Sequence, residues 1–189
     1  MLRQTIAIAI AITGLLLVSQ PAAAGKWSTL KTKYLSVHYQ DTADLKTFDR
    51  KIKPVKHTGG FSSFSAGNSQ SSGQFGRLSA KLDTLCEKVQ LILDMRKPIR
   101  VNVRIYSDKA ALDEAYYKIY KKKKSLRAWY LFRYNTIYLQ AGDVFAGMLA
   151  HEIAHAVVDH YLDVRPPRAT AEILARYVDA HLNEEAKTY

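Results

Sequence analysis

The stretch from about Val144 to Tyr161 combines an apolar helical pattern with three polar side chains, and it constrains the fold more than any other part of the sequence. The polar residues are His151, Glu152 and His155, in the order His-Glu-x-x-His. The apolar residues recur at helical spacing and are Phe145, Met148, Leu149, Ile153, Ala154, Val157 and Val158. Because residues four apart share one helix face, both imidazoles point the same way. The helix must pack into a core and still present one polar side.

Two imidazoles one helical turn apart are typical of a zinc site. Glu152, next to the first histidine, is placed to act as the general base that takes a proton from a zinc-activated water. Two alternatives stay open on these residues alone. His151, Glu152 and His155 could form a solvent-facing stripe, or they could hold a metal that only stabilises the fold. A structural zinc usually has four protein ligands.

A catalytic zinc needs a third protein ligand and an open position for water. Glu172 is the best candidate, because it follows the turn at 165–167 and lies early in a last helix predicted from about Ala169 to Leu182. An antiparallel return of that helix would bring Glu172 beside His151 and His155. We therefore expect the metal ligands to be two histidines and one glutamate.

Two rivals for the third ligand fit less well. His160 lies five positions after His155 and points away from it on a continuous helix. Asp163 could reach the histidines only if the helix ended early. Glu172 as an ordinary surface residue is the remaining alternative.

These residues resemble the His-Glu-x-x-His zinc metallopeptidases of the gluzincin type, particularly the small peptidase MA-like domains. In that family the third ligand lies in a segment resembling Pro-x-x-x-Ser-Glu-Gly-Leu-Ala-x-Tyr. The segment from Pro167 to Tyr177 (Pro-Arg-Ala-Thr-Ala-Glu-Ile-Leu-Ala-Arg-Tyr) follows this outline. The resemblance places Glu172 on the third ligand and implies that the chain is a hydrolase of peptide bonds, a zincin-like metallopeptidase with Zn²⁺ as its cofactor.

The chain departs from the family pattern at Ala171, Ile173 and Arg176. At the position of Arg176, thermolysin-like relatives carry a carboxylate that orients a histidine ligand. Asp179, one turn further along, could take that role, because ligating histidines usually donate to an outer carboxylate or carbonyl.

Peptide hydrolysis also requires a donor for the oxyanion and a surface for the substrate. Three side chains are available as donors, and the sequence does not choose among Tyr177, Tyr161 and His181. We expect an extended peptide or protein substrate to pair with an edge strand at Thr136 to Leu139.

Upstream of the two final helices, strand-like and helix-like patterns alternate. The expected elements are a first strand at Lys33–Tyr39, a helix at Leu78–Leu93, a strand at Ile99–Tyr106, a short helix at Asp108–Tyr120 and a strand at Thr136–Leu139. Asp143 is expected to cap the helix that carries the histidines. The order predicts an α+β fold, a small zincin-like domain over residues 25–189 with a mixed or antiparallel sheet.

The first 24 residues predict a secretory signal peptide. Arg3 precedes an apolar run from Ile6 to Val18, and Ala22 to Ala24 form a cleavage site of small residues. The run is shorter than the roughly 18 to 20 residues that cross a bilayer. We expect the mature chain to start at Gly25 and to be exported, periplasmic or secreted; a retained N-terminal anchor is the alternative.

Cys86 is the only cysteine, so an exported chain of this kind closes no internal disulfide and depends on its core or a bound metal. Cys86 lies within the apolar helical pattern between Leu78 and Leu93. We expect it to be a buried small hydrophobe rather than a nucleophile.

The chain is basic, with 28 Lys and Arg against 17 Asp and Glu, a formal charge of +11. Removing Arg3 with the signal peptide leaves +10. This charge favours anionic surroundings, such as a membrane surface, a cell-envelope polymer or an acidic substrate, and export makes nucleic acid the least suited partner.

Lys121 to Lys124 form a basic block among tyrosines and Trp129. The block could bind an anionic surface, or it could be a solvated helix end favoured by the helix dipole. The first interpretation supplies an alternative function: a catalytically inactive metal-binding domain that binds anionic cell-envelope components or a protein partner.

The segment from Gly59 to Gly76 is rich in Gly, Ser, Asn and Gln and predicts a flexible loop. It could be a surface connection or, through Phe61 and Phe64, a lid over a site.

Overall fold

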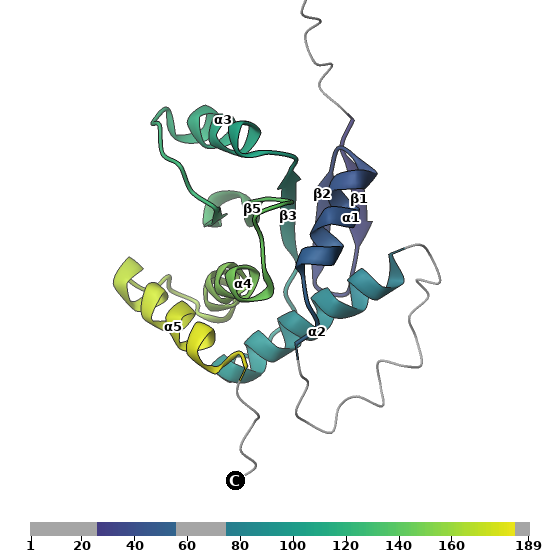
Figure 1. Ribbon diagram of the computed structural model, residues 1–189. Coiled ribbons are helices and arrows are strands. Elements are labelled where there is room, and N and C mark those ends of the chain that lie inside the picture. Colours follow the sequence, from purple (N-terminus) through teal and green to yellow (C-terminus); the bar gives the residue numbers. More distant parts are fainter. Residues whose placement is uncertain (1–25, 56–74, 184–189) are drawn as a thin grey trace, which may run out of the picture.

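The computed structural model describes residues 26–55 and 75–183 (Figure 1). The predicted signal peptide and residues 59–74 of the predicted loop lie outside these ranges. The described elements are β1 (Ser28–Lys31), β2 (Leu35–Tyr39), α1 (Thr42–Lys51), α2 (Gly76–Leu93), β3 (Val101–Tyr106), α3 (Lys109–Tyr120), β4 (Ala128–Leu131), a 3-10 turn (Phe132–Tyr134), β5 (Thr136–Gln140), α4 (Ala146–Tyr161) and α5 (Arg168–His181). Within the described ranges, none of the helices has the length and apolar character needed to cross a bilayer. The α+β fold class is confirmed.

The strands form one mixed sheet in the order β1-β2-β3-β5-β4. The two outer pairs, β1 with β2 and β4 with β5, are antiparallel, whereas β2, β3 and β5 run parallel. Parallel neighbours require crossover connections, and here α1 and α2 connect β2 to β3 while α3 and β4 lie between β3 and β5.

Alternation along the strands gives the sheet two different faces. In β3, Val101, Val103 and Ile105 are buried, while Arg104 between them is exposed. Successive side chains of a strand point to opposite faces, so this strand alone separates a core face from a more polar one.

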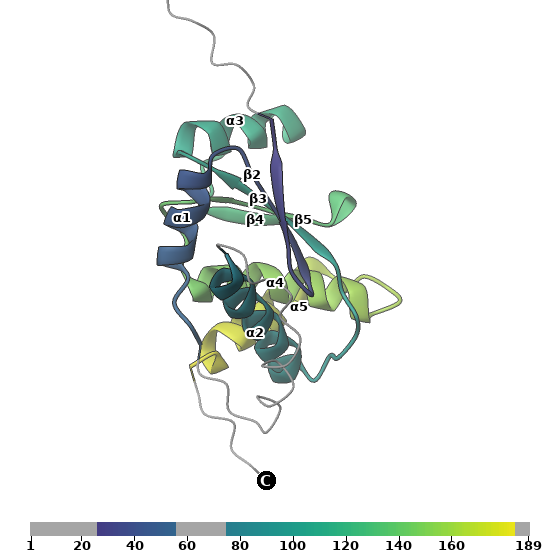
Figure 2. The ribbon, with the colours of Figure 1, turned by 90° about the vertical axis from the view of Figure 1, so that its right-hand side faces the viewer.

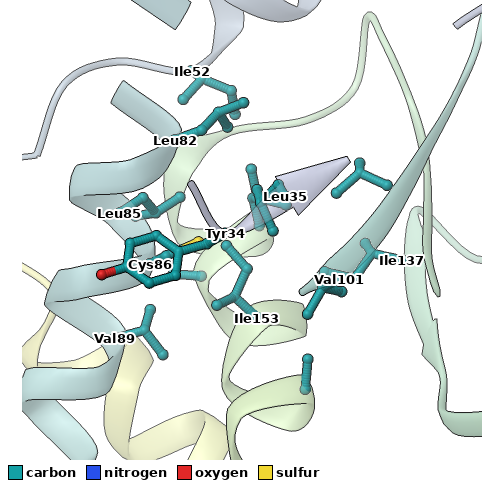
Figure 3. Close-up of a cluster of buried hydrophobic side chains, with 14 of the residues drawn as sticks. Tyr34, Leu35, Ile52, Leu82, Leu85, Cys86, Val89, Val101, Ile137 and Ile153 are labelled. Carbon is teal, nitrogen blue, oxygen red and sulfur yellow. The ribbon is translucent and has the colours of Figure 1, made fainter. Parts of the chain in front are cut away.

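The main core lies between the buried face of the sheet and helices α1, α2 and α4 (Figure 2). Figure 3 shows side chains from α2, β2, β3, β5 and α4 meeting there, with Cys86 among them. Cys86 is fully buried, as its helical pattern predicts, and burial raises the pKa of its thiol well above the usual range. A smaller cluster under α3, on the other face, contains Leu112, Ala115, Trp129 and Tyr138.

Helix α4 occupies the central place among the helices, because it packs against α2, α5 and the sheet strand β4 (Figure 1). Its fully buried residues include Leu149, Ile153 and Val157, which recur every four positions along one face. This face anchors the helix that carries the histidine motif.

Several boundaries differ from those predicted. The strand at Lys33–Tyr39 begins at Leu35 and is second in the sheet, because β1 precedes it. Elements β1, α1 and β4 were not predicted, and Gly76 begins α2 instead of ending a loop. The predicted strand at 99–106 starts only at Val101, although Ile99 is buried.

The expectation that Thr136–Leu139 is an edge strand is wrong. The strand β5 lies between β3 and β4, so its backbone groups are already paired on both sides. The edge on this side of the sheet is β4.

Truncating the core face of α4 tests this packing. We expect Leu149→Ala to lower the free energy of unfolding by about 2 to 5 kcal/mol, since it leaves a cavity in the core. Ile173→Ala is the matched control, because Ile173 is 66% exposed on α5 and Leu149 is 0% exposed; its effect should stay within about 0.5 kcal/mol. Urea unfolding followed by tryptophan fluorescence measures both, and equal effects would contradict the buried position of Leu149.

Candidate metal centre

The candidate site lies on the polar side of α4. His151 and His155 are partly buried, and Glu152 is buried at 9% exposure. The two imidazole rings lie with centroids 5.0 Å apart and an interplanar angle of 79°. Because the opposite face of α4 is fixed in the core, the two imidazoles are held at this separation by a rigid helix.

Helix α5 brings Glu172 to the two histidines. Oε2 of Glu172 lies 3.6 Å from Nε2 of His151 and 3.8 Å from Nε2 of His155. The potential ligand atoms of the three residues all lie within 4.8 Å of one another. Glu172, predicted from spacing and resemblance, is thus the third member of the cluster.

The other carboxylate oxygen of Glu172 faces Arg168. Oε1 lies 3.8 Å from Nε of Arg168, one turn earlier on α5. Arg168 is largely exposed, so this ion pair contributes little to stability. Because this ion pair uses Oε1, the other oxygen, Oε2, remains directed at the imidazoles.

Asp179 holds the first histidine from the outside. Its Oδ2 lies 2.9 Å from Nδ1 of His151. A hydrogen bond at Nδ1 places the proton there and leaves Nε2, the atom facing Glu172, with its lone pair free. The structure therefore provides the outer carboxylate suggested at Asp179, two turns after Glu172 on the same helix.

The donor set fits a zinc ion. A tetrahedral ion with bonds of about 2.1 Å keeps its ligand atoms about 3.4 Å apart. The distances of 3.6 and 3.8 Å from Glu172 to the imidazoles are close to this spacing, so small side-chain movements would complete the geometry. Two imidazole nitrogens and one carboxylate oxygen are also a ligand combination that catalytic zinc uses, with one position left for water.

The rival ligands lie outside the cluster. Nδ1 of His160 is 2.7 Å from the carbonyl oxygen of Ala156, so its ring is tied to its own helix. Asp163 is exposed in the turn after α4. Within residues 26–55 and 75–183, His151, His155 and Glu172 are the only group of three or more potential ligands close enough to share a metal ion.

The three oxyanion candidates are not brought together. Tyr161 and Tyr177 are exposed at the surface, and the ring of Tyr177 lies 4.0 Å from that of His181. Nδ1 of His181 is 2.7 Å from the carbonyl oxygen of Tyr177. The geometry singles out none of them as an oxyanion donor.

The carboxyl of Glu152 is poised near neutrality. Burial raises its pKa to about 7, although the charge of His151 and a hydrogen bond from the backbone N–H of Tyr130 lower it; Glu172 and Asp179 raise it further. A cation held by the neighbouring ligands would lower this pKa. A carboxyl that titrates near neutral pH can both accept and release a proton.

His155 is kept neutral. Burial lowers its pKa most, and the charges of His151, Arg165 and Arg168 act in the same direction, while Glu172 opposes them. The neutral imidazole is the form that binds a metal, so these surroundings favour ligation.

The expectation that Asp143 caps α4 is wrong. Both carboxylate oxygens of Asp143 accept from Arg127, at 2.8 Å from Nε and 2.5 Å from Nη2. The helix instead begins at Ala146, and Phe145 at the N-cap position offers no side-chain cap. This forked pair holds the carboxylate of Asp143 at Arg127 and links the loop that enters α4 to the start of β4.

The basic block at Lys121–Lys124 follows α3 and is exposed. The aromatic residues around it are largely committed to packing. The ring of Tyr116 meets Trp129 at 5.2 Å and Tyr120 at 4.4 Å, and Trp129 belongs to the cluster under α3. These rings support α3 more than they extend the basic surface.

Comparisons with protein-family models, curated proteins and solved structures find no match for this chain. The resemblance to gluzincin-type peptidases therefore rests on the motif and on the arrangement of its residues.

Three features beside the cluster were not predicted: the approach of Tyr130 on β4 to Glu152, the ion pair of Arg168 and the Arg127–Asp143 pair. The first depends on β4 passing α4, which no local pattern indicates. Arg168 follows the turn that precedes α5, but Arg127 lies before β4, so no local pattern indicates its pairing with Asp143.

The ligand set predicts which substitutions remove metal. We expect His155→Ala to lose stoichiometric zinc after equilibration at micromolar zinc, because two ligands hold the ion far less tightly than three. His160→Ala on the same helix should keep it. Zinc measured by mass spectrometry of the desalted proteins tests both, and a zinc-replete His155→Ala protein would refute this ligand set.

Asp179 should act on the metal through His151. We expect Asp179→Asn to weaken zinc binding by about 10- to 100-fold, the usual cost of losing an outer carboxylate. Asp163→Asn, an exposed change nearby, should leave the affinity as it is. Competition with a zinc chelator gives the dissociation constants; an unaltered constant for Asp179→Asn would show that its contact with His151 has no influence on the metal.

Proposed function

We propose that this chain is a zinc-dependent metallopeptidase that hydrolyses peptide bonds. The observation that carries the proposal is the convergence of His151, His155 and Glu172 beside a buried Glu152. A zinc ion bound by the three ligands would act as a Lewis acid, polarising the scissile carbonyl and making water nucleophilic at neutral pH.

The protein's own part in the reaction is proton transfer by Glu152. Its carboxylate takes a proton from the attacking water and passes it to the nitrogen of the leaving amine. Its burial next to His151 supports this role, because a carboxylate beside the metal ligands is placed to accept the proton of a metal-bound water. Asp179 keeps His151 in the tautomer whose Nε2 faces the site.

An extended substrate would lie along the outer side of β4, which replaces β5 as the strand proposed for substrate pairing. At this edge a peptide can add to the sheet through main-chain hydrogen bonds. The packing of β4 against α4 supports this position, because it brings the edge strand close to the helix that carries the general base. A peptide bound there would have its backbone next to the carboxylate that transfers the proton.

The predicted signal peptide belongs to the proposal as well: the peptidase would act outside the cytoplasm, in the periplasm or the medium. The sheet edge and Glu152 favour this function over an inactive metal-binding domain.

Replacing Glu152 separates catalysis from metal binding. We expect Glu152→Gln to retain zinc and to lower kcat for peptide cleavage at least about 100-fold, because an amide cannot accept the water proton. Glu114→Gln, an exposed change on α3, should leave cleavage as in the wild type. The measurement is turnover of a quenched fluorescent peptide library with zinc content determined in parallel.

Cleavage by Glu152→Gln at the wild-type rate would contradict the proposed mechanism. Zinc-loaded wild-type protein that cleaves no peptide of the library would instead favour the inactive metal-binding alternative.

A further inference from the structure

A cavity of about 780 Å³ opens on the side of the site where α4 begins, and His151 and Glu152 form part of its wall. The rest of the wall combines two chemical kinds of side chain. Its apolar part includes Phe145, Met148 and Leu182, and its cationic part consists of Lys51, Lys53 and Arg127. No step of the proposed mechanism uses these cations.

The two lysines are held in place by the residue between them. Ile52 is buried in the main core and has an extended backbone, so the side chains on either side of it point away from that core. Lys81 of α2 also holds the end of α1 in place, because its Nζ donates to the carbonyl oxygens of Asp49 and Ile52 at 2.5 and 2.9 Å. The end of α1 therefore presents both lysines to the cavity from an anchored backbone.

Among the described residues, Lys51 and Lys53 have no carboxylate partner. Arg127 is paired with Asp143 through both carboxylate oxygens. Neither lysine forms an ion pair with a carboxylate in the part of the chain that the structure describes, although Lys51 is near enough to help lower the pKa of Asp143.

The carboxylates of the same wall are already engaged at the metal end. Asp179 is hydrogen-bonded to His151, and Glu152 is buried next to His151. The two lysines are thus the cations left for a ligand. An anionic group next to an apolar surface is the complement of such a wall.

We propose that this cavity binds a carboxylate of the substrate, so that the enzyme selects peptides with a carboxylate close to the scissile bond. The inference rests on the proposed peptidase function. The carboxylate can come from an acidic side chain or from a free C-terminus, and Lys51 and Lys53 are the specificity-determining residues in both cases.

Binding to the zinc-loaded Glu152→Gln protein tests the inference without turnover. The probes are fluorescent peptides of one length with both ends blocked, in which a single Glu or Gln occupies each position in turn. A second pair has Gln throughout and either a free or an amidated C-terminus. We expect at least one carboxylate peptide to bind about tenfold more tightly than its neutral partner, and the preference to weaken with salt.

The pairs distinguish the two sources of the carboxylate. A gain confined to blocked Glu peptides assigns the cavity to an acidic side chain, and a gain confined to the free C-terminus assigns it to the chain end. In either case, adding Lys51→Glu and Lys53→Glu should remove the preference. Adding Lys46→Glu, an exposed change of the same charge on α1, should preserve it.

Three results would overturn the inference: equal binding within every pair, no measurable binding of any probe, or a preference that survives reversal of both lysines. Wild-type cleavage of neutral and acidic peptides at equal rates would also overturn it while leaving the peptidase proposal intact. A lysine-dependent binding preference without cleavage by the wild-type protein would instead contradict the peptidase proposal. The cavity would then bind carboxylates in a protein that is not a peptidase.

Discussion

The packing of α5 on α4 is the contact on which the site depends. Each helix supplies an incomplete set of groups: two imidazoles and a glutamate from α4, and two carboxylates from α5. Ala175 and Val178, both fully buried, attach α5 to the core between the positions of Glu172 and Asp179. The small side chain of Ala175 favours close approach of the two helices. The apolar face of α5 therefore determines how far Glu172 and Asp179, on its polar face, lie from the histidines.

The position of α4 imposes two opposing demands on one helix. Its core face must exclude water, and its other face must present the polar side chains of His151, Glu152 and His155. The compromise is visible at Glu152, whose burial raises its pKa and so makes it a better proton acceptor than an exposed glutamate. The same packing that stabilises the fold therefore adjusts the chemistry of the candidate base.

The sequence was most informative where an element repeats its own pattern. Helices α2, α4 and α5 and strand β3 show sustained periodicity, and they were predicted within a few residues. Elements β1 and α1 carry few buried residues: β1 is mostly exposed, and Leu45 and Phe48 are the buried side chains of α1. The order of strands, and hence the edge at β4, depends on long-range pairing that local patterns do not encode. Glu172 could be predicted because its distance from the motif and its segment both pointed to it, whereas Lys51 and Lys53 lie at the distant end of α1 and just after it.

The burial of Cys86 has a practical consequence. Because the only thiol of the chain is sealed between α2 and the sheet, a thiol reagent can reach it only when that part of the core opens. The rate of labelling would thus report on opening of the core around α2. Comparing the protein with and without zinc would reveal how far the proposed ion between α4 and α5 slows that opening. Cys86 is therefore an intrinsic probe of whether the proposed metal ion strengthens the cohesion of the whole domain.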